Sequence, residues 1–281
     1  MLFNNIEDVL SCPLCGEGSV RFINNKAISS CCNNLFNVEN DQIIIFDDYL
    51  SSISEVIARD NQAKEYLDHS KFPTQISRMQ SWMFNIPKEL LAGITLDLGC
   101  GTGPTTQMLL EIGTRNVLSV DFSINSLRIN KDVCQNHTTK PIYILQDIRN
   151  IRFKKSSASV LVMADFLQHI IDNNEREKFL MNAFQSLIPG GYFFLSFFNV
   201  NIKNYFKNDI SGSFASGAIK YERLNYKNVI SSFPDDIVID KIIPMNISHH
   251  AAFDRFLCSF PFSNLFSRMI IIQGRKISDA I

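Results

Sequence analysis

Residues Ile94–Thr106 read ITLDLGCGTGPTT, and this stretch decides the fold. Ile94–Leu98 is short and apolar apart from Asp97, which predicts a buried strand. Pro104 suits the first turn of a following helix, because its missing N–H would have no partner there. Between strand and helix lie three glycines at alternate positions: Gly99, Gly101 and Gly103. A strand, a glycine turn and a helix start bring a nucleotide-like ligand against bare backbone.

The spacing of these glycines separates two classes of cofactor. A dinucleotide fingerprint requires Gly-x-Gly-x-x-Gly. Its last position falls on Pro104 when counted from Gly99 and on Thr106 when counted from Gly101, so neither frame fits. The pattern Asp-x-Gly-x-Gly-x-Gly instead resembles motif I of the class I S-adenosylmethionine (SAM) methyltransferases. The resemblance implies that this motif binds SAM through Asp97, Gly99, Cys100, Gly101 and Gly103.

Acidic residues follow the next two expected strands. Asn116–Asp121 places Asp121 18 residues after Gly103, close to the interval at which a βαβ unit sets a carboxylate beside a ribose. Phe122 is then expected to lie against an adenine face. After the strand Ile142–Leu145, the resemblance implies that Asp147 accepts a hydrogen bond from the adenine amino group. It also implies that the backbone N–H of Ile148 meets a ring nitrogen.

The fourth expected strand, Val160–Ala164, leads to Phe166 and His169. In related enzymes this segment faces the methionine part of the cofactor and the acceptor, so Ala164 and Phe166 are also expected at the cofactor. His169 occupies the place of a histidine frequent in the ubiquinone- and menaquinone-methyltransferase-like group (methyltransferase type 11). It can act as a general base, with an ordinary pKa of about 6.5, or pack beneath the pocket as a structural residue.

The remaining pattern predicts a doubly wound, seven-stranded Rossmann-like sheet over residues 93–281. Pro189-Gly190-Gly191 separates an amphipathic helix from a fifth strand, and the resemblance covers Ile94–Phe198. The last two strands are expected at Ile237–Ile243 and Ser267–Gln273, the final one antiparallel. Residues 199–235 are the expected acceptor-specificity insertion. Its candidate acceptor contacts are aromatic: Tyr205, Phe206, Phe214 and Tyr221.

Four of the seven cysteines precede residue 33, which favours a metal module over a disulfide framework. Cys12-Pro-Leu-Cys15-Gly16 has the spelling of a zinc knuckle, and Cys31 and Cys32 are the available second pair. Residues 1–47 resemble the zinc ribbons ahead of some methyltransferase domains, including a bacterial guanine-N1 ribosomal RNA methyltransferase. Ser29 stands where that pattern has a cysteine. Zn²⁺ held by Cys12, Cys15, Cys31 and Cys32 and a metal-free, degenerate ribbon both stay open.

Residues 48–92 are expected to form a helical cover over the pocket. Its candidate pocket residues are Tyr66, Arg78, Gln80 and Trp82. A basic run over residues 149–155 is expected to be a solvated loop. The phenylalanine-rich stretch Phe253–Phe266 is expected to be packed core, and a hydrophobic pocket wall, a dimer surface and an interfacial contact are the alternatives.

Composition limits the possible functions. The chain of 281 residues is 46% apolar, enough for a packed core, and its net charge of −1 gives no general attraction to nucleic acid or membrane. No apolar run approaches the roughly 20 residues of a spanning helix, and the first ten residues lack the basic start of a secretory signal. We therefore expect a cytoplasmic protein.

The predicted function is SAM-dependent methyl transfer to O, N or C of a small metabolite or natural product. The chain is near neutral and its variable regions are aromatic rather than basic, which favours a small acceptor. One alternative is a methyltransferase acting on a ribosomal or transfer RNA base, suggested by the N-terminal cysteines. Another is a SAM-binding partner or regulator without catalytic activity. The sequence does not specify the oligomeric state.

Overall fold

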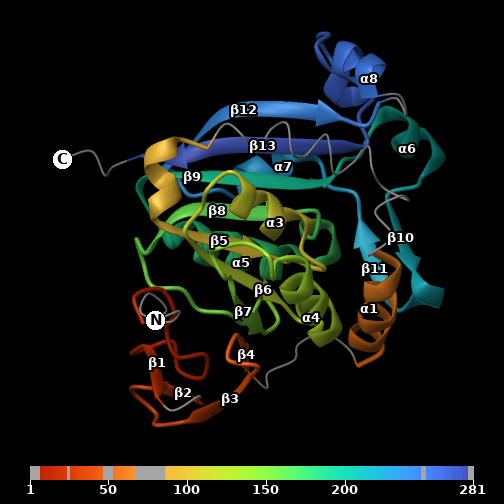
Figure 1. The fold of residues 1–281 in the computed structure, drawn as a ribbon. Coiled ribbons are helices and arrows are strands. Elements are labelled where there is room, and N and C mark those ends of the chain that lie inside the picture. The colour runs from red at the N-terminus through yellow and green to blue at the C-terminus, as the bar shows by residue number, and fades with distance from the viewer. Residues whose placement is uncertain (1–6, 24–25, 47–52, 67–85, 248–250, 278–281) are drawn as a thin grey trace.

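The structure is a computed structural model that describes residues 7–23, 26–46, 53–66, 86–247 and 251–277 (Figure 1). The strands are β1 Val20–Ile23, β2 Lys26–Ser29, β3 Leu35–Glu39, β4 Ile43–Ile45, β5 Ile94–Leu98, β6 Asn116–Asp121, β7 Ile142–Leu145, β8 Ala158–Ala164, β9 Leu187–Phe198, β10 Ser211–Phe214, β11 Ile219–Glu222, β12 Ile237–Met245 and β13 Met269–Lys276. The helices are α1 Ile53–Tyr66, α3 Pro104–Glu111, α4 Ile124–Val133, α5 Asn173–Gln185, α6 Ile202–Lys207, α7 Tyr226–Ser231 and α8 Ala251–Cys258. Short 3₁₀ turns are η2 Lys88–Ala92, η3 Leu167–His169, η4 Ala215–Gly217 and η5 Ser263–Leu265.

The central part of the sheet has the strand order β7-β6-β5-β8-β9-β13-β12. Neighbouring strands from β7 to β9 run parallel, whereas β13 is antiparallel to both β9 and β12. This arrangement confirms the predicted doubly wound sheet with an antiparallel last strand. Because helices cover both faces, β5 and β8 are buried along most of their length, as a parallel sheet requires.

The N-terminal strands extend this sheet beyond the seven strands that were predicted. Among the described residues the sheet has eleven strands, because β4 pairs in parallel with β7 and β1–β3 continue outward from β4. The pairing sets Ile44 opposite Ile144 and covers an edge that would otherwise expose unpaired backbone groups.

The basic run after β7 anchors these N-terminal strands. Lys154 N–H donates to Val9 O (2.7 Å), Ser11 N–H donates to Arg152 O (3.1 Å), and Leu10 forms a β-bridge with Phe153. The Lys154 ammonium also donates to the carbonyl of Glu7. Arg152 and Lys155 are exposed, as expected of a solvated loop, but the pairing of this run with the N-terminal strands was not predicted.

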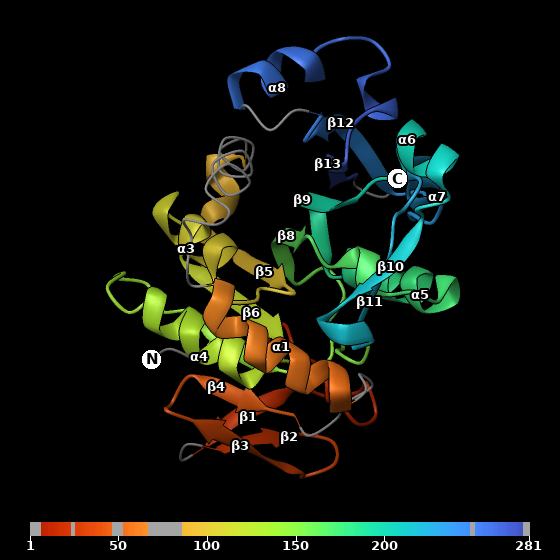
Figure 2. The same ribbon diagram turned by 90° about the vertical axis from the view of Figure 1, so that its right-hand side faces the viewer.

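The carboxyl ends of the parallel strands meet at one edge of the sheet, and several elements lie across that edge. Figure 2 looks toward this edge and shows α1 crossing it beside α4, with the β10–β11 hairpin next to α1. The α6 and α8 helices lie toward the same end of the molecule in Figure 1. Ligands of open α/β sheets bind at such carboxyl edges, so a ligand site is expected at this edge.

The core prediction for Phe253–Phe266 was wrong. Several large apolar side chains of α8 and of the segment after it are exposed. The core instead draws its aromatic residues from α5 and β9, where the Phe184 ring lies edge-on to Phe193 at 5.0 Å. None of the described helices has both the length and the apolar content needed to cross a bilayer.

Candidate cofactor and acceptor site

The glycine turn after β5 leaves one position open to a ligand. Gly99 and Gly101 have φ values of 67° and 53°, in the left-handed region that favours glycine. A Cβ on Gly99 would lie 2.5 Å from the Phe166 ring, whereas a Cβ on Gly101 would meet nothing within 4 Å. Gly103, before α3, packs against Asn130, and the Cys100 side chain is buried. The backbone at Gly101 therefore faces space that a ligand can fill.

Asp121 ends β6 directly beside this turn. Its Oδ2 accepts the N–H of Gly101 and its Oδ1 accepts the N–H of Ser123, both at 2.9 Å. Burial raises the pKa of the Asp121 carboxyl, and these two backbone donors oppose that shift. A carboxylate oxygen can accept more than one hydrogen bond, so this group retains the capacity to bind ribose hydroxyls. Phe122, next in the chain, is half-buried.

Asp97 lies beneath the turn and is fully buried. Its Oδ2 accepts a 2.6 Å hydrogen bond from the Thr106 hydroxyl, while its Oδ1 has no partner within the described part of the chain. Burial raises the Asp97 pKa to about 7, the Thr106 bond opposes this shift, and the charge of Asp121 adds to it. A buried, unpartnered carboxylate oxygen is costly, and a cationic donor such as an ammonium group would satisfy it.

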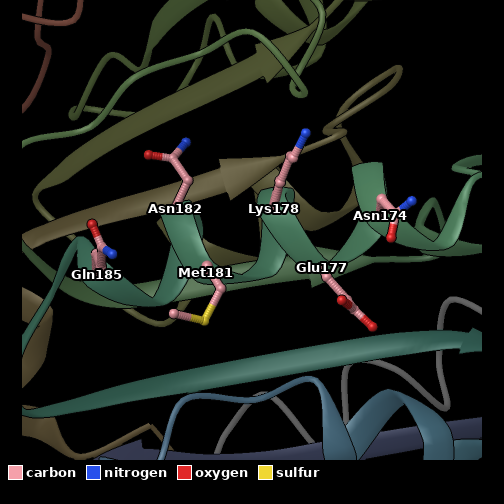
Figure 3. Close-up of a pocket in the computed structure, with 6 residues that line it drawn as sticks. All are labelled: Asn174, Glu177, Lys178, Met181, Asn182 and Gln185. Atoms are coloured by element: carbon pink, nitrogen blue, oxygen red, sulfur yellow. The ribbon is translucent and has the colours of Figure 1, made fainter.

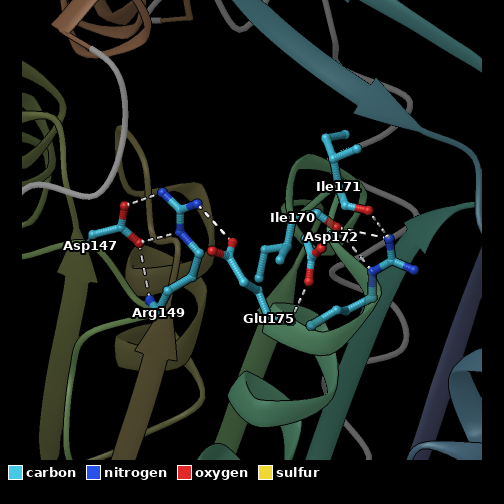
Figure 4. A network of polar contacts seen from close by, with 7 residues as sticks. Asp147, Arg149, Ile170, Ile171, Asp172 and Glu175 are labelled. Atoms are coloured by element: carbon cyan, nitrogen blue, oxygen red, sulfur yellow. Dashed lines mark hydrogen bonds and ion pairs between the residues drawn. The ribbon is translucent and has the colours of Figure 1, made fainter.

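Asp147, the predicted adenine acceptor, is tightly paired with Arg149 (Figure 4). Arg149 Nε and Nη2 donate to Oδ1 and Oδ2 at 2.9 and 2.5 Å, and the Arg149 backbone N–H donates to Oδ1 at 3.0 Å. The remaining guanidinium nitrogen reaches Glu175 at 3.1 Å. Arg149 therefore belongs to the site, and Ile148 between the two residues is buried.

The turn after β8 brings Phe166 to the glycine turn. Ala164 and Asp165 are half-buried, and Asp165 has a φ of 57°, which is uncommon outside glycine. The Ser196 hydroxyl donates to Asp165 Oδ1 at 2.7 Å and helps to hold this conformation. The chain then turns so that the Phe166 ring covers Gly99 and meets Phe179 edge-on at 5.4 Å.

His169 is held against the β10–β11 hairpin. Its Nδ1 lies 2.7 Å from the carbonyl oxygen of Lys220. A carbonyl only accepts, so Nδ1 carries the proton and Nε2 is an acceptor in the neutral ring. Burial and the positive charge of Arg59 lower the His169 pKa, the Lys220 bond opposes both effects, and the resulting pKa is about 4. At neutral pH the ring is therefore an uncharged acceptor.

The hairpin also carries two of the predicted acceptor contacts. The Phe214 and Tyr221 rings stack at 4.8 Å, and Tyr221 is next to the residue that holds His169. Tyr205 and Phe206 of α6 are largely exposed.

The α1 helix supplies three residues that the sequence did not single out. Asp60 Oδ1 accepts the Ser123 hydroxyl (2.5 Å) and the Asn125 N–H (3.2 Å), which fixes α1 over the start of α4. The charge of Arg59 lowers the pKa of both Asp121 and His169. Burial raises the Glu55 pKa, and the charges of Arg59 and Arg149 oppose that shift.

In the sequence, Glu55 and Arg59 are one helical turn apart, and this spacing could have indicated that they lie on the same face of α1. The predicted pocket residues Arg78, Gln80 and Trp82, and the side chain of Tyr66, lie outside the described residues.

The four N-terminal cysteines form a second cluster, away from the glycine turn. Their sulfur atoms all lie within 4.8 Å of one another. Cys15 is 3.2 Å from Cys31 and 3.5 Å from Cys32, and Cys12 is 3.9 Å from Cys32. A tetrahedron of sulfurs around zinc, with Zn–S distances of about 2.3 Å, has edges of about 3.8 Å. The spacing of the four thiols fits that geometry.

Ser29 supplies no thiol to this cysteine cluster, although its hydroxyl is hydrogen-bonded to the Cys12 thiol. It is buried and accepts the N–H of Asn34 at 3.2 Å. The adjacent Cys31 and Cys32 supply both thiols of the second pair instead.

A hollow of about 530 Å³ lies on the outer face of α5 (Figure 3). It is lined by Asn174, Glu177, Lys178, Met181, Asn182 and Gln185. All six residues come from successive turns of one helix, and none is a predicted site residue. The hollow is an open groove along a solvated helix face rather than part of the site.

Residues 96–195 match the methyltransferase domain family. This segment contains Asp97, the glycine turn, Asp121, Asp147 and His169, and so coincides with the candidate site. A carboxy-S-adenosyl-L-methionine synthase of Shewanella halifaxensis (strain HAW-EB4) is 32% identical over 118 residues, or 40% of this chain and 45% of that protein. A ubiquinone biosynthesis O-methyltransferase of Methylobacterium sp. (strain 4-46) is 27% identical over 118 residues, 42% of this chain and 46% of that protein. The chain thus spans less than half the length of these curated relatives.

Solved structures share the fold. A SAM-dependent methyltransferase from Methanosarcina mazei superposes with a TM-score of 0.55 at 19% identity, covering 70% of this chain and 97% of that chain. A putative S-adenosylmethionine-dependent methyltransferase from Listeria monocytogenes superposes with a TM-score of 0.54 at 15% identity, covering 72% of this chain and 100% of that chain. The chain therefore has the Rossmann-like methyltransferase fold.

Substitution of Gly101 tests the placement of the cofactor. Gly101→Asp should raise the Kd for SAM at least about 100-fold, because a side chain and a negative charge enter the open space at the turn. Gly113→Asp is the matched control, since Gly113 also has a positive φ of 96° and a Cβ there would meet nothing within 4 Å. Titration calorimetry gives both constants. Unchanged affinity in Gly101→Asp would refute the placement.

His169 should make stability depend on pH. Its pKa is about 4 in the folded chain and about 6.5 when unfolded, so the unfolded state binds more protons between these values. The stabilisation is complete above about pH 6.5 and is lost as the pH falls toward 4. Denaturant unfolding across this range should give a shallower pH slope for His169→Gln than for the native chain. Parallel slopes would contradict the neutral, buried ring.

Proposed function

We propose that the chain is a SAM-dependent methyltransferase acting on O, N or C of a small metabolite or natural product. The observation that carries the proposal is the pair of carboxylates at the glycine turn. Asp121 is fixed by two backbone N–H groups, and Asp97 has a buried oxygen that lacks a partner among the described residues. Together they provide acceptors for the ribose hydroxyls and for the α-ammonium group of SAM.

Each predicted binding residue then has a definite task. Asp97 would hold the ammonium group, Gly101 would admit the methionine portion, and Asp121 would bind the ribose. Asp147, with Ile148, would bind the adenine while Arg149 orients its carboxylate. The resemblance also assigns Gly99, Cys100, Gly103, Phe122, Ala164 and Phe166 to the cofactor surface.

SAM supplies an electrophilic methyl group on a sulfonium that leaves as a neutral thioether. The protein therefore mainly has to align the acceptor and exclude water. Phe166 and the stacked Phe214 and Tyr221 rings provide apolar walls near the turn and the hairpin. The Nε2 of His169 can accept the acceptor's proton. With a pKa of about 4 it is a weak base, so its main contribution would be to orient a hydroxyl or amine.

A small acceptor fits the surface better than RNA. In the basic run that could have bound phosphate, Arg149 pairs with Asp147 and Glu175, and Lys154 pairs with the N-terminal strands. Arg152 and Lys155 are exposed, and two cations do not form an extended basic surface. RNA binding requires a continuous cationic surface with salt-dependent affinity.

Carboxylation of the cofactor is a second candidate reaction, favoured by the similarity to a carboxy-S-adenosyl-L-methionine synthase.

Mass spectrometry of the cofactor products distinguishes these reactions. Purified protein incubated with SAM and a panel of phenols, amines and carboxylic acids should form S-adenosylhomocysteine and an acceptor heavier by one methylene. Asp121→Ala should weaken SAM binding by about 1–3 kcal/mol through lost charge-assisted hydrogen bonds. Asp132→Ala, an exposed acid on α4, is the matched control. A carboxylated cofactor, or no product with any acceptor, would contradict the proposal.

We also propose that residues 1–47 form a zinc-ribbon-like module and that residues 48–92 cover the site of the domain in residues 93–281. The four sulfurs have the mutual spacing of a tetrahedral site. Burial raises the Cys12 pKa, but the backbone N–H groups of Cys15 and Leu14, together with side-chain hydrogen bonds from Cys31 and Ser29, outweigh it and lower the pKa to about 7. Backbone donors of this kind favour a thiolate, which is the form that binds zinc.

Metal analysis tests the zinc site. The purified protein should contain close to one zinc per chain, and Cys12→Ser should lose most of it because one of four ligands is removed. Cys258→Ser, a cysteine outside the cluster, should keep the native content. Zinc below about a tenth per chain in the native protein would show that the ribbon has no metal.

A further inference from the structure

Among the described residues, exposed large apolar side chains gather toward one end of the molecule, on α8, on the segment after it and on α6. We name this surface the aromatic end and define it by Phe206, Phe253, Phe256, Phe260, Phe262 and Phe266. We propose that the aromatic end docks on an anionic membrane surface. This inference stands apart from the proposed methyl transfer.

Three rings of the aromatic end form a row along α8 and the residues directly after it. Phe253, Phe256 and Phe260 follow one another at helical spacing, with ring centroids 6.4 and 4.9 Å apart. Phe256 is 57% exposed, Phe262 74% and Phe206 81%. At about 200 Å² per aromatic side chain, the six rings expose on the order of 700 Å². The row of three rings accounts for on the order of 300 Å² of this area, and contiguous apolar patches of a few hundred Å² on soluble domains are often functional.

The backbone beneath these rings is well anchored. Asp254 is buried and accepts the N–H of Asn246 at 3.1 Å, which ties α8 to the end of β12. Asn199 Nδ2 donates to the carbonyl of Asn264 (2.9 Å), and Asn264 in turn donates to the Tyr226 hydroxyl (2.8 Å). The folded structure therefore presents the rings outward on a fixed frame.

The charges around the aromatic end match an anionic partner. Lys203, Lys207 and Arg268 are exposed beside it. In residues 199–217 and 245–268 the only acids are Asp209 and Asp254. Asp254 is buried, and Asp209 accepts from Asn204 (3.0 Å) and pairs with Arg223 (3.6 Å). Aromatic side chains with lysine and arginine beside them are typical of segments that bind the interface of anionic lipids.

The shape and the charges disfavour other occupants. Figure 1 shows α8 standing out beyond the end of β12, a convex form that suits insertion among headgroups better than binding of a small molecule. Pairing with a second copy would bring Lys203, Lys207 and Arg268 toward their own equivalents, with no unpaired exposed acid in these segments to offset the repulsion.

Vesicle sedimentation of the full chain tests the proposal. The protein should pellet with vesicles of equal phosphatidylglycerol and phosphatidylcholine, and at least about fivefold less with phosphatidylcholine alone or at high salt. The double variant Phe253→Ser, Phe256→Ser should lower binding at least about fivefold. Leu35→Ser, which is 65% exposed on β3, is its control and should bind as the native chain does.

A second pair of variants tests the charges independently of α8. Lys203→Glu with Lys207→Glu should also abolish pelleting, whereas Lys178→Glu on the exposed face of α5 should not. Thermal unfolding checks that all variants are folded. Absence of pelleting by the native chain would overturn the proposal. So would a dimer in solution that only the phenylalanine variants dissociate, without any effect on vesicles.

Discussion

The Asp121 carboxylate is the contact on which the rest of the site depends. By accepting the N–H groups of Gly101 and Ser123 at 2.9 Å each, it joins the glycine turn after β5 to the first turn of α4. Asp60 of α1 accepts the Ser123 hydroxyl and so ties the cover helix to the same point. Three segments distant in sequence thus converge on one acid, which burial would disfavour in its charged form without these donors.

The local parts of this arrangement could be predicted from the sequence. The strands β5, β6 and β7, the glycine turn and the Ser123 cap depend on neighbouring residues, so their patterns are readable. The contacts of Arg149, Arg59 and Asp60 were missed because they arise only when the chain folds back on itself. The pairing of β4 with β7 was not predicted for the same reason. The exposure of Phe253–Phe266 was not predicted either, because the sequence of an apolar segment does not show whether other residues cover it.

The charges in the candidate site differ between the proposed cofactor side and the proposed acceptor side. On the cofactor side, Asp97 is buried beside Asp121, and its pKa near 7 reflects a charge that an ammonium ligand would stabilise. On the acceptor side, His169 remains neutral because burial and Arg59 both disfavour its protonation. In the proposed function, Asp97 and Asp121 would form the anionic binding site for the methyl donor, and neutral His169 would contact the acceptor. These residues would constrain the donor closely, and the aromatic rings of the hairpin would constrain the acceptor.

The most direct test of this account is a crystal structure with S-adenosylhomocysteine bound. In that complex the ribose hydroxyls should meet Asp121, the ammonium group should lie at Asp97 Oδ1, and the adenine should lie between Phe122 and Asp147. The Asp147–Arg149 pair should persist in that complex. A ligand bound elsewhere, or a glycine turn that remains empty at saturating concentration, would contradict the central claim.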